Sequence, residues 1–303
     1  MNLSKLFSDL LGAGYGWTAK TPDQLLSLRK TSEKFRPLDR FFGLGLSVST
    51  DQLLADGLTS GLIAELGNPA PFAVSSDAAG GYLIHDHWPP RPENAAEYVH
   101  LGPESFYVAR EIQKHAEAFS EKTVLDLGCG SGILSFFAST SSTRVIGIDS
   151  SSRATTFARD TAAARGIQNI EFIHARIGSD AADAVVGSDF DLAAFNPPLG
   201  VPSGEDTRPH RDGGKLGIEV PLLFLDFAKR HLKPGGEAWF ICGNPIVGGK
   251  PLFLAELKFR TEWELLESRC LDPYFNQSVA RKHGYAEQSI TRIELLLIKT
   301  RRR

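Results

Sequence analysis

The fold is decided by the stretch Val124-Leu125-Asp126-Leu127-Gly128-Cys129-Gly130-Ser131-Gly132. An apolar run breaks into glycines at three alternate positions, and residues 133–138 then have the composition of a helix. This order predicts a buried strand, a tight turn and a helix start whose open N-terminus leaves amide donors facing outward. Asp126 indicates which class of cofactor the turn would bind. A carboxylate at the end of the strand would repel a pyrophosphate, so the stretch favours a cofactor with hydroxyl and ammonium groups.

Composition sets outer limits on the kind of protein. The chain has 303 residues, of which 42% are hydrophobic and 23% charged, and its formal net charge is −3. These values are typical of a globular protein with one large or two modest domains and give no sign of a strong electrostatic grip on nucleic acid. Three scattered cysteines predict neither disulfides nor a metal site. With no apolar run near the ~20 residues of a membrane span and no signal peptide, we expect a cytoplasmic protein.

Residues 1–95 differ from the rest of the chain. Their pattern predicts several short helices, one of them opening at Pro22 with Thr21 as its cap, and then two short strands around 72–74 and 82–84. Helices followed by a hairpin outline a winged helix. However, the candidate recognition helix at 59–65 carries no Lys or Arg, and phosphate contacts dominate nucleic-acid affinity. We therefore expect residues 1–95 to be a small, mostly helical lid, substrate-binding or dimerising module, which leaves the oligomeric state open, a homodimer included.

Beyond a Pro-rich stretch, strand and helix patterns alternate. This alternation predicts an α/β domain over residues 96–303, with a Rossmann-like, mainly parallel seven-stranded sheet and helices on both faces. Ligands of such a sheet bind outside the carboxyl ends of its strands. The predicted strands are 123–127, 144–148, 170–174, 191–195, 237–242, 263–270 and 293–298, and the main predicted helices are 133–139, 151–165, 216–232 and 251–259.

A second acidic residue follows the glycine turn at the end of the next predicted strand. Asp149 lies roughly 20 positions beyond the turn, where a carboxylate can accept hydrogen bonds from both hydroxyls of a ribose. The alternative is a helix cap, because Asp149-Ser150-Ser151 precedes a predicted helix and Asp and Ser are common caps. Both roles are compatible with the sequence.

These motifs together resemble the class I S-adenosylmethionine-dependent methyltransferases, over roughly residues 100–300. The resemblance implies that S-adenosylmethionine is the cofactor and that residues 96–303 are the catalytic domain. It further implies that Asp126 and the turn residues Gly128, Cys129, Gly130 and Gly132 hold the methionine end, and that Asp149 with Ser150 holds the ribose. Family members usually have an acid after the third strand that contacts the adenine amine. Here that place offers Arg176, Ala175 or backbone amides.

The fourth predicted strand ends in Asn196-Pro197-Pro198-Leu199. Two prolines fix φ and remove two donors, so the backbone carbonyls stay available as acceptors, and Asn196 adds a side-chain carbonyl. Such a cradle can hold the N–H bonds of an amine or amide while its lone pair faces an electrophilic methyl group, which is catalysis by positioning. We expect Asn196 and the Pro197 carbonyl to position the nucleophile, and Asn196 to lie beside the cofactor as well. The alternative is an ordinary Asn-Pro turn.

Asn-Pro-Pro resembles the amino-methyltransferase branch of the family, whose members methylate exocyclic amines of nucleic acid or a glutamine side chain. Leu199 stands where that branch has an aromatic residue that stacks on a planar target. Together with the acidic chain, this favours a nitrogen of a small molecule or a protein side chain as acceptor and argues against nucleic acid as a partner. Tyr107, Leu199, His210 and Asp212 are candidate substrate contacts, the last two in a polar loop that is either a lid or a solvated hinge.

Three other functions stay open at this point. An enzyme with the same pocket could cyclise the methionyl chain of S-adenosylmethionine and release methylthioadenosine. The acceptor could be an exocyclic amine of RNA or DNA after all. A protein without catalytic activity could read DNA with a winged helix and sense the cofactor with its second domain, although an intact Asn-Pro-Pro speaks against this.

Overall fold

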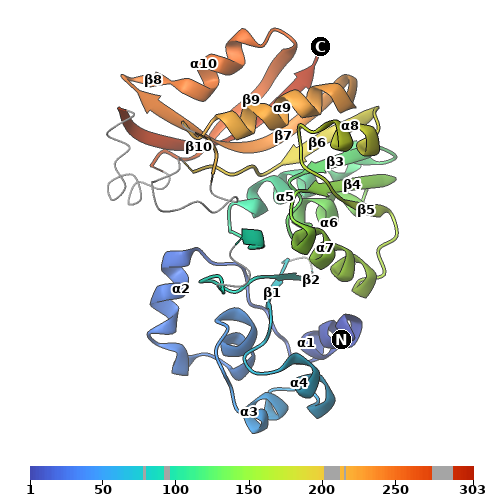
Figure 1. Cartoon of the computed structure of the whole chain (residues 1–303), viewed down its shortest axis with the longest axis vertical. Helices are drawn as coiled ribbons and strands as arrows, with labels where there is room; N and C mark the ends of the chain where they lie inside the picture. Colours follow the sequence, from blue (N-terminus) through green and yellow to red (C-terminus); the bar gives the residue numbers. More distant parts are fainter. Residues whose placement is uncertain (78–79, 92–95, 201–211, 215, 275–288) are drawn as a thin grey trace.

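The structure is a computed structural model of the whole chain, and it describes residues 1–77, 80–91, 96–200, 212–214, 216–274 and 289–303. Figure 1 shows a sheet covered by helices and, on one side of it, a lobe made of the N-terminal elements. Among the described residues, no helix combines the length and the apolar composition that a membrane crossing needs.

The described residues form an eight-stranded sheet in the order β5-β4-β3-β6-β7-β10-β9, with β8 paired to β7. Neighbours from β5 to β7 are parallel, and β10 is antiparallel to both β7 and β9. The predicted α/β fold with a mainly parallel sheet is thus confirmed. The strands are β3 Thr123–Leu127, β4 Arg144–Asp149, β5 Ile170–His174, β6 Phe190–Phe195, β7 Leu232–Val247, β8 Lys250–Pro251, β9 Trp263–Asp272 and β10 Ile290–Arg302.

Strand order places a switch point between β3 and β6. The chain runs outward from β3 to β4 and β5, then returns to the other side of β3 as β6. Leu127 pairs with Phe195 in this parallel register, so the residues that follow β3 and β6 emerge side by side at the same edge of the sheet. In sheets of this kind the crevice beside the switch point is where ligands bind.

Helices cover both faces because successive strand residues point in opposite directions. Val124 and Val145 pack with α5, α6 and α7, while Leu125 and Ile146 pack with α8, α9 and α10. Figure 1 shows the two layers on either side of the sheet. The helices are α5 Ser105–Lys114, α6 Ile133–Ser139, α7 Ser152–Ala164, α8 Asp180–Val186, α9 Glu219–His231 and α10 Leu252–Phe259, with the short η4 at Ala116–Phe119.

The N-terminal lobe consists of short helices followed by an antiparallel pair of strands. The predicted cap at Thr21 is confirmed, since it forms a capping box with Gln24. Between residues 38 and 46 the chain forms only a five-residue π-helix and then turns away through Gly45 at φ 64°. A winged helix and a domain boundary at residue 95 stay predictions. The elements are α1 Leu3–Gly12, α2 Pro22–Arg29, η1 Ser32–Lys34, η2 Asp39–Gly43, α3 Thr50–Ala55, α4 Ser60–Leu66, β1 Ala73–Ser76 and β2 Tyr82–His85.

Helix α7 belongs to two apolar clusters. Its residues Ala154 and Phe157 lie in the cluster of the N-terminal lobe, whereas Ala158 and Ala162 lie in the cluster beneath the sheet. An ion pair reinforces this junction, because the Arg153 guanidinium binds the buried carboxylate that follows β2, at Asp86, with Nη2 2.6 Å from Oδ1. The N-terminal lobe is therefore attached to the helix that begins just after Asp149.

We predict that Arg153→Met lowers the free energy of unfolding by about 3 kcal/mol, because it leaves the Asp86 carboxylate buried without its cation. The side chain of Asp86 is only 4% exposed. The matched control is Arg144→Met, whose partner Glu171 is 59% exposed, and a change below about 1 kcal/mol is expected there. Urea denaturation of both variants measures the difference. Equal losses would show that the Asp86–Arg153 pair does not secure the junction.

Candidate active site

The glycine turn is fixed against the end of β4. The backbone amides of Gly128 and Cys129 both donate to the Ile148 carbonyl, at 2.8 and 3.0 Å. Gly130 and Gly132 have φ values of 53° and 89°, a region that favours glycine. A Cβ at Gly132 would lie 2.9 Å from the Phe136 ring, but a Cβ at Gly130 would have only the His100 carbonyl nearby, at 3.9 Å. The middle of the turn therefore faces unfilled space.

Asp149 joins the turn to the start of α7. Its Oδ2 accepts from the Gly130 amide at 2.9 Å, and its Oδ1 accepts from the Ser151 amide at 2.8 Å. Burial raises the pKa of this carboxyl, and the two backbone donors oppose that shift. The stretch Asp149-Ser150-Ser151 does cap α7, but the capping residue is Ser151, which accepts from the Ala154 amide, and not Asp149. Each carboxylate oxygen keeps a further lone pair that a ribose hydroxyl could use.

Asp126 is fully buried beneath the turn. Its Oδ2 accepts from the amide and the hydroxyl of Ser135, at 2.9 and 2.7 Å. Its Oδ1 is buried without a hydrogen-bond donor among the described residues, as is the hydroxyl of Ser131. Burial raises the pKa of Asp126 to about 7, although the Ser135 hydrogen bonds oppose the shift. A buried acceptor without a donor is costly, and an ammonium group would satisfy it.

Asn196 emerges from β6 beside the glycine turn. Its Nδ2 donates to the hydroxyl of Ser105 at 2.8 Å, and Ser105 is the first residue of α5 and only 7% exposed. Within the described part of the chain, no hydrogen-bond donor reaches the carboxamide oxygen. Pro197, which follows, is buried and has no N–H to offer. The sequence analysis did not find this contact, because nothing local links Ser105 to a residue 91 positions away.

The other predicted cofactor residues surround the turn to differing degrees. Cys129 is buried, and burial raises the pKa of its thiol well above the usual range. Ser150 is exposed, and its carbonyl accepts from His174 Nε2 at 3.0 Å. Arg176 is exposed beyond the end of β5. The contact of these three residues with the cofactor stays a prediction.

The candidate substrate residues are not gathered in one place. Tyr107 is 41% exposed on α5, whereas Leu199 is 8% exposed and packs in the apolar cluster of α5 and α6. Asp212 is exposed and accepts from the Gly214 amide, and its backbone bridges to Gly200. His210 lies outside the described residues, as does most of the polar loop.

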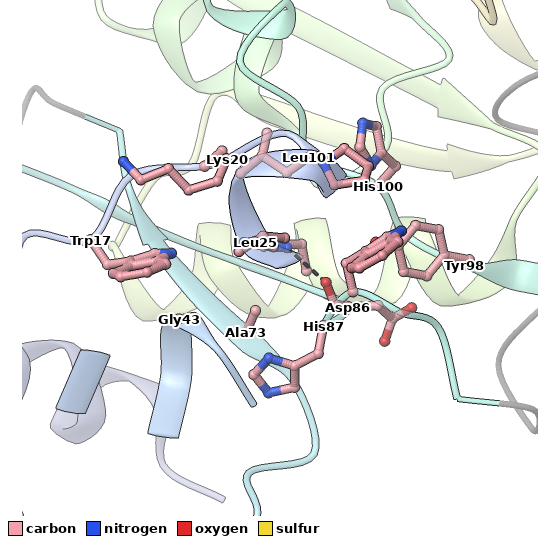
Figure 2. A pocket seen from close by; sticks show the side chains of 14 residues that line it. Trp17, Lys20, Leu25, Gly43, Ala73, Asp86, His87, Tyr98, His100 and Leu101 are labelled. Carbon is pink, nitrogen blue, oxygen red and sulfur yellow. Dashed lines mark hydrogen bonds between the residues drawn. The ribbon is translucent and has the colours of Figure 1, made fainter. Parts of the chain in front are cut away.

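A pocket that the sequence did not reveal lies between the N-terminal lobe and residues 98–101. Figure 2 shows Trp17, Lys20 and His87 around it, with Tyr98 and His100 on the opposite side. Both ring nitrogens of His87 are buried without a partner in the described ranges, and burial lowers its pKa to about 3. His100 connects the pocket to the glycine turn. Its side chain lines the pocket, and its carbonyl lies over Gly130 in the turn.

The residues at the turn fit S-adenosylmethionine by their chemistry. The donor-free oxygen of Asp126 suits the ammonium group, and the space beside Gly130 leaves room for the methionyl chain. Asp149, at the end of β4, has lone pairs available for ribose hydroxyls. These three residues would hold the cofactor, which when bound supplies an electrophilic methyl group on its sulfonium.

Comparison with known proteins supports this fit. The family described as Methyltransferase small domain matches residues 107–261. The chain is 28% identical over 124 residues to the Cypemycin N-terminal methyltransferase of a Streptomyces species, covering 41% of this chain and 43% of that protein. It is 27% identical over 124 residues to Ribosomal RNA small subunit methyltransferase C of Alcanivorax borkumensis, covering 41% and 33%. The chain thus spans less than half the length of these curated relatives.

Solved structures agree on the fold. Trm5b from Pyrococcus abyssi is 17% identical, with a TM-score of 0.50 over 78% of this chain and 57% of that one. The complex of aTrm5 and tRNALeu gives 14% identity and the same score over 78% and 54%. The family match confirms that the domain is of the S-adenosylmethionine-dependent methyltransferase class.

The comparisons contradict our expectation that nucleic acid is not a partner. One curated relative is named as a ribosomal RNA methyltransferase, and one structure of this fold is a complex with tRNA. The expectation was wrong for a physical reason: a net charge of −3 averages over the whole surface, whereas phosphate contacts need only one local face.

We predict that S-adenosylmethionine binding tightens as pH rises through about 7. The cofactor's ammonium group needs the ionised form of Asp126, whose pKa in the free protein is about 7, so affinity should change by up to about tenfold per pH unit below that value. Calorimetric titrations between about pH 6 and pH 8 measure it. In Asp126→Asn, binding should be weak at every pH; a pH dependence that persists in this variant would exclude Asp126 as its source.

Folding stability should show the opposite trend. The folded-state pKa of Asp126 is raised above its unfolded value of 3.8. The stability that Asp126 contributes is therefore fully present below pH 3.8, its unfolded pKa, and is lost as pH rises through about 7. The difference in unfolding free energy between the free protein and Asp126→Asn, followed over this range, tests the sign.

Proposed function

Because the chain belongs to the methyltransferase small domain family, we propose that it transfers a methyl group from S-adenosylmethionine to an amine nitrogen of an RNA base. The observation that carries this proposal is the hydrogen bonding of the Asn196 side chain beside the glycine turn. With its Nδ2 bound to Ser105, its carboxamide presents an oxygen, and an oxygen can hold only a group that has a hydrogen to donate. An amine has such hydrogens.

The chain's own contribution is positioning. Asn196 Oδ1 and the Pro197 carbonyl accept the N–H bonds of the acceptor, which leaves the nitrogen lone pair free to face the methyl group. Holding reactants in this geometry converts a bimolecular reaction into an effectively unimolecular one. The site needs no strong base for this, because the proton can leave the nitrogen after the new N–C bond has formed.

An RNA acceptor is supported by sequence similarity and by local charge. One relative is named as a ribosomal RNA methyltransferase. In addition, residues 20–40 carry six Lys and Arg side chains against three Asp and Glu, a local charge of +3 in a chain whose total is −3. Lys30 and Lys34 are exposed there, in the part of the N-terminal lobe that begins at the pocket residue Lys20. Such a face can contact phosphates even though the whole chain is acidic.

A second acceptor, the terminal amine of a peptide, is favoured by one observation. The other curated relative is named as an N-terminal methyltransferase of cypemycin. Asn196 would hold that amine in the same way. The cyclisation alternative loses part of its support. The side chain of Leu199 packs in the core, so the absence of an aromatic ring at this position does not indicate a different pocket beside the cofactor. Mass spectrometry of the cofactor products without an acceptor separates cyclisation from methyl transfer.

We predict that Asn196→Ala lowers kcat/KM for methyl transfer to RNA by about a hundredfold or more, because the acceptor amine is no longer held in line. Its dissociation constant for S-adenosylmethionine should stay within about twofold of that of the unmodified chain. Transfer of labelled methyl groups to total RNA and to short peptides measures the loss and identifies the acceptor class. If only peptides are labelled, the acceptor is the terminal amine of a peptide and not RNA. If Asn196→Ala lowers cofactor affinity as much as it lowers activity, Asn196 does not act by holding the acceptor amine.

We further predict that the double variant Lys30→Gln/Lys34→Gln raises KM for RNA and reduces the dependence of log KM on log salt by about one unit per lysine. The control is Lys250→Gln, on β8 at the sheet end of the molecule, where Lys250 is exposed. Steady-state kinetics at several salt concentrations provide the slopes. Unchanged slopes in the double variant would show that this face does not contact phosphate.

A further inference from the structure

We propose that the pocket of the N-terminal lobe binds a nucleobase of the RNA acceptor, namely a base that neighbours the methylated one along the RNA. This inference rests on the proposed function and deepens it, because it assigns a second point of contact with the substrate. It is carried by the aromatic side chains that line the pocket, Trp17, His87, Trp88 and Tyr98, and by the hydrogen bonds that His87 lacks.

Two of these rings are held in place by glycines on either side of Leu44. A Cβ at Gly43 would lie 2.4 Å from two atoms of the Trp17 ring, and a Cβ at Gly45 would lie 2.7 Å from the His87 ring. Each ring therefore packs directly against a glycine, and a larger residue at either position would displace it. Figure 2 shows Tyr98 across the pocket from Trp17. The aromatic walls are thus already formed in the free protein, as is usual for ligand sites.

The chain segments that carry these rings are joined by Arg29, the last residue of α2. Its Nη2 donates to the carbonyl of Leu44 and, at 3.0 Å, to the carbonyl of Trp88. Among the described residues no carboxylate pairs with Arg29, nor with the pocket residue Lys20, whose Nζ donates to the Thr18 hydroxyl at 2.7 Å. Two cations that no described carboxylate neutralises make this part of the lobe attractive to a phosphate group.

His87 is the residue that points to a polar ligand. Its side chain is buried, and neither ring nitrogen has a hydrogen-bond partner in the described ranges. Burial lowers the pKa of His87 to about 3; the nearby Ala70 carbonyl opposes this shift but already accepts from Arg91 Nη2 at 2.8 Å. At neutral pH the ring is therefore uncharged, with one nitrogen as donor and the other as acceptor. Such a ring costs stability unless a ligand supplies the missing partner.

These properties together match a nucleobase. A base is planar, so it can stack on Trp17 or Tyr98, and its edge carries the donors and acceptors that an uncharged imidazole needs. Its phosphate would be attracted by the partly exposed Lys20. The phenyl ring of a peptide would fill the same space but would leave the nitrogens of His87 without a partner. The observations therefore favour a base over an aromatic side chain.

The location of the pocket determines which base it holds. The side chain of His100 lines the pocket, and its carbonyl would lie 3.9 Å from a Cβ at Gly130. The pocket is therefore next to the cofactor turn, with His100 between the two. Asn196, which would hold the methylated amine, enters from β6 and does not line the pocket. The pocket thus suits a neighbour of the methylated base.

The test uses the full chain saturated with S-adenosylhomocysteine, which fills the cofactor site and keeps the probes out of it. The probes are the four nucleoside 5′-monophosphates, and saturation-transfer NMR measures their binding. At least one should bind, and His87→Leu should weaken its binding about tenfold, the value of one hydrogen bond. Equal binding of ribose 5-phosphate would show that the site recognises only a phosphate and would overturn the inference. An equal loss in Asn196→Ala would also overturn it, because the probe would then occupy the acceptor site.

Urea denaturation shows whether His87 has a merely structural role. Because its nitrogens have no partner in the free protein, His87→Leu should not lower the urea concentration at which half of the protein is unfolded. The matched control is His231→Leu. His231 is also buried, but its ring contacts the Gly187 carbonyl and the Asp183 carboxylate, so this variant should be less stable and should bind nucleotide normally. Loss of stability without loss of binding in His87→Leu would overturn the inference.

A variant at the partly exposed Lys20 provides a test that does not depend on a buried substitution. Lys20→Gln should weaken the binding of the nucleotide and leave that of the corresponding nucleoside within about twofold, because only the nucleotide carries a phosphate. If both bind as they do to the unmodified chain, no base with its phosphate lies in this pocket. Binding of a phenylalanine-containing tripeptide in place of all four nucleotides would likewise overturn the inference and assign the pocket to a peptide.

Methyl-transfer kinetics separate this inference from the proposed function. His87→Leu should raise KM for RNA by the same factor by which it weakens nucleotide binding. Nucleotide binding that depends on His87, in a protein that does not methylate RNA, would refute the RNA acceptor and support the base site. Methyl transfer to RNA with a KM that His87→Leu does not change would support the function and refute the base site.

Discussion

The attachment of the glycine turn to the end of β4 determines where the rest of the site lies. The Ile148 carbonyl takes two amides of the turn, and the Asp149 carboxylate takes a third, from Gly130. These bonds hold the loop between β3 and α6 against the neighbouring strand, with Asp126 buried below the turn and Asp149 beside it. Since β6 lies on the other side of β3, Asn196 completes the site from the opposite side.

Most of the sheet could be predicted from the sequence because parallel strands buried on both faces are short apolar runs between recognisable breaks. β3, β4 and β6 are examples. β7 was predicted to begin at residue 237, since Lys233-Pro234-Gly235-Gly236 is typical of a turn, yet the strand begins at Leu232. The pairing with β6 shifts register between Phe190 and Leu192, and such an irregularity depends on the partner strand, which local composition does not specify.

The site was predictable only as far as strand order determines it. The side chains of Asp126, Asp149 and Asn196 come from neighbouring strand ends, and the general rule for parallel sheets places them together. Ser105 and His100 could not be found in this way, because they reach the site from the first residue of α5 and from the segment before it, through tertiary contacts alone. Leu199 shows the reverse error: its place in the motif suggested a contact with the acceptor, but its side chain belongs to the core.

The position of α7 in two apolar clusters limits how this molecule could have changed during evolution. An N-terminal lobe taken from another protein would have to match Ala154 and Phe157 of α7 while Ala158 and Ala162 of the same helix continued to fit the sheet. Exchange of the lobe as a separate module would leave one of these surfaces exposed to water. New acceptor specificities in this lineage should therefore arise by substitutions within the lobe, and its sequence should vary in step with the residues of α7 that contact it.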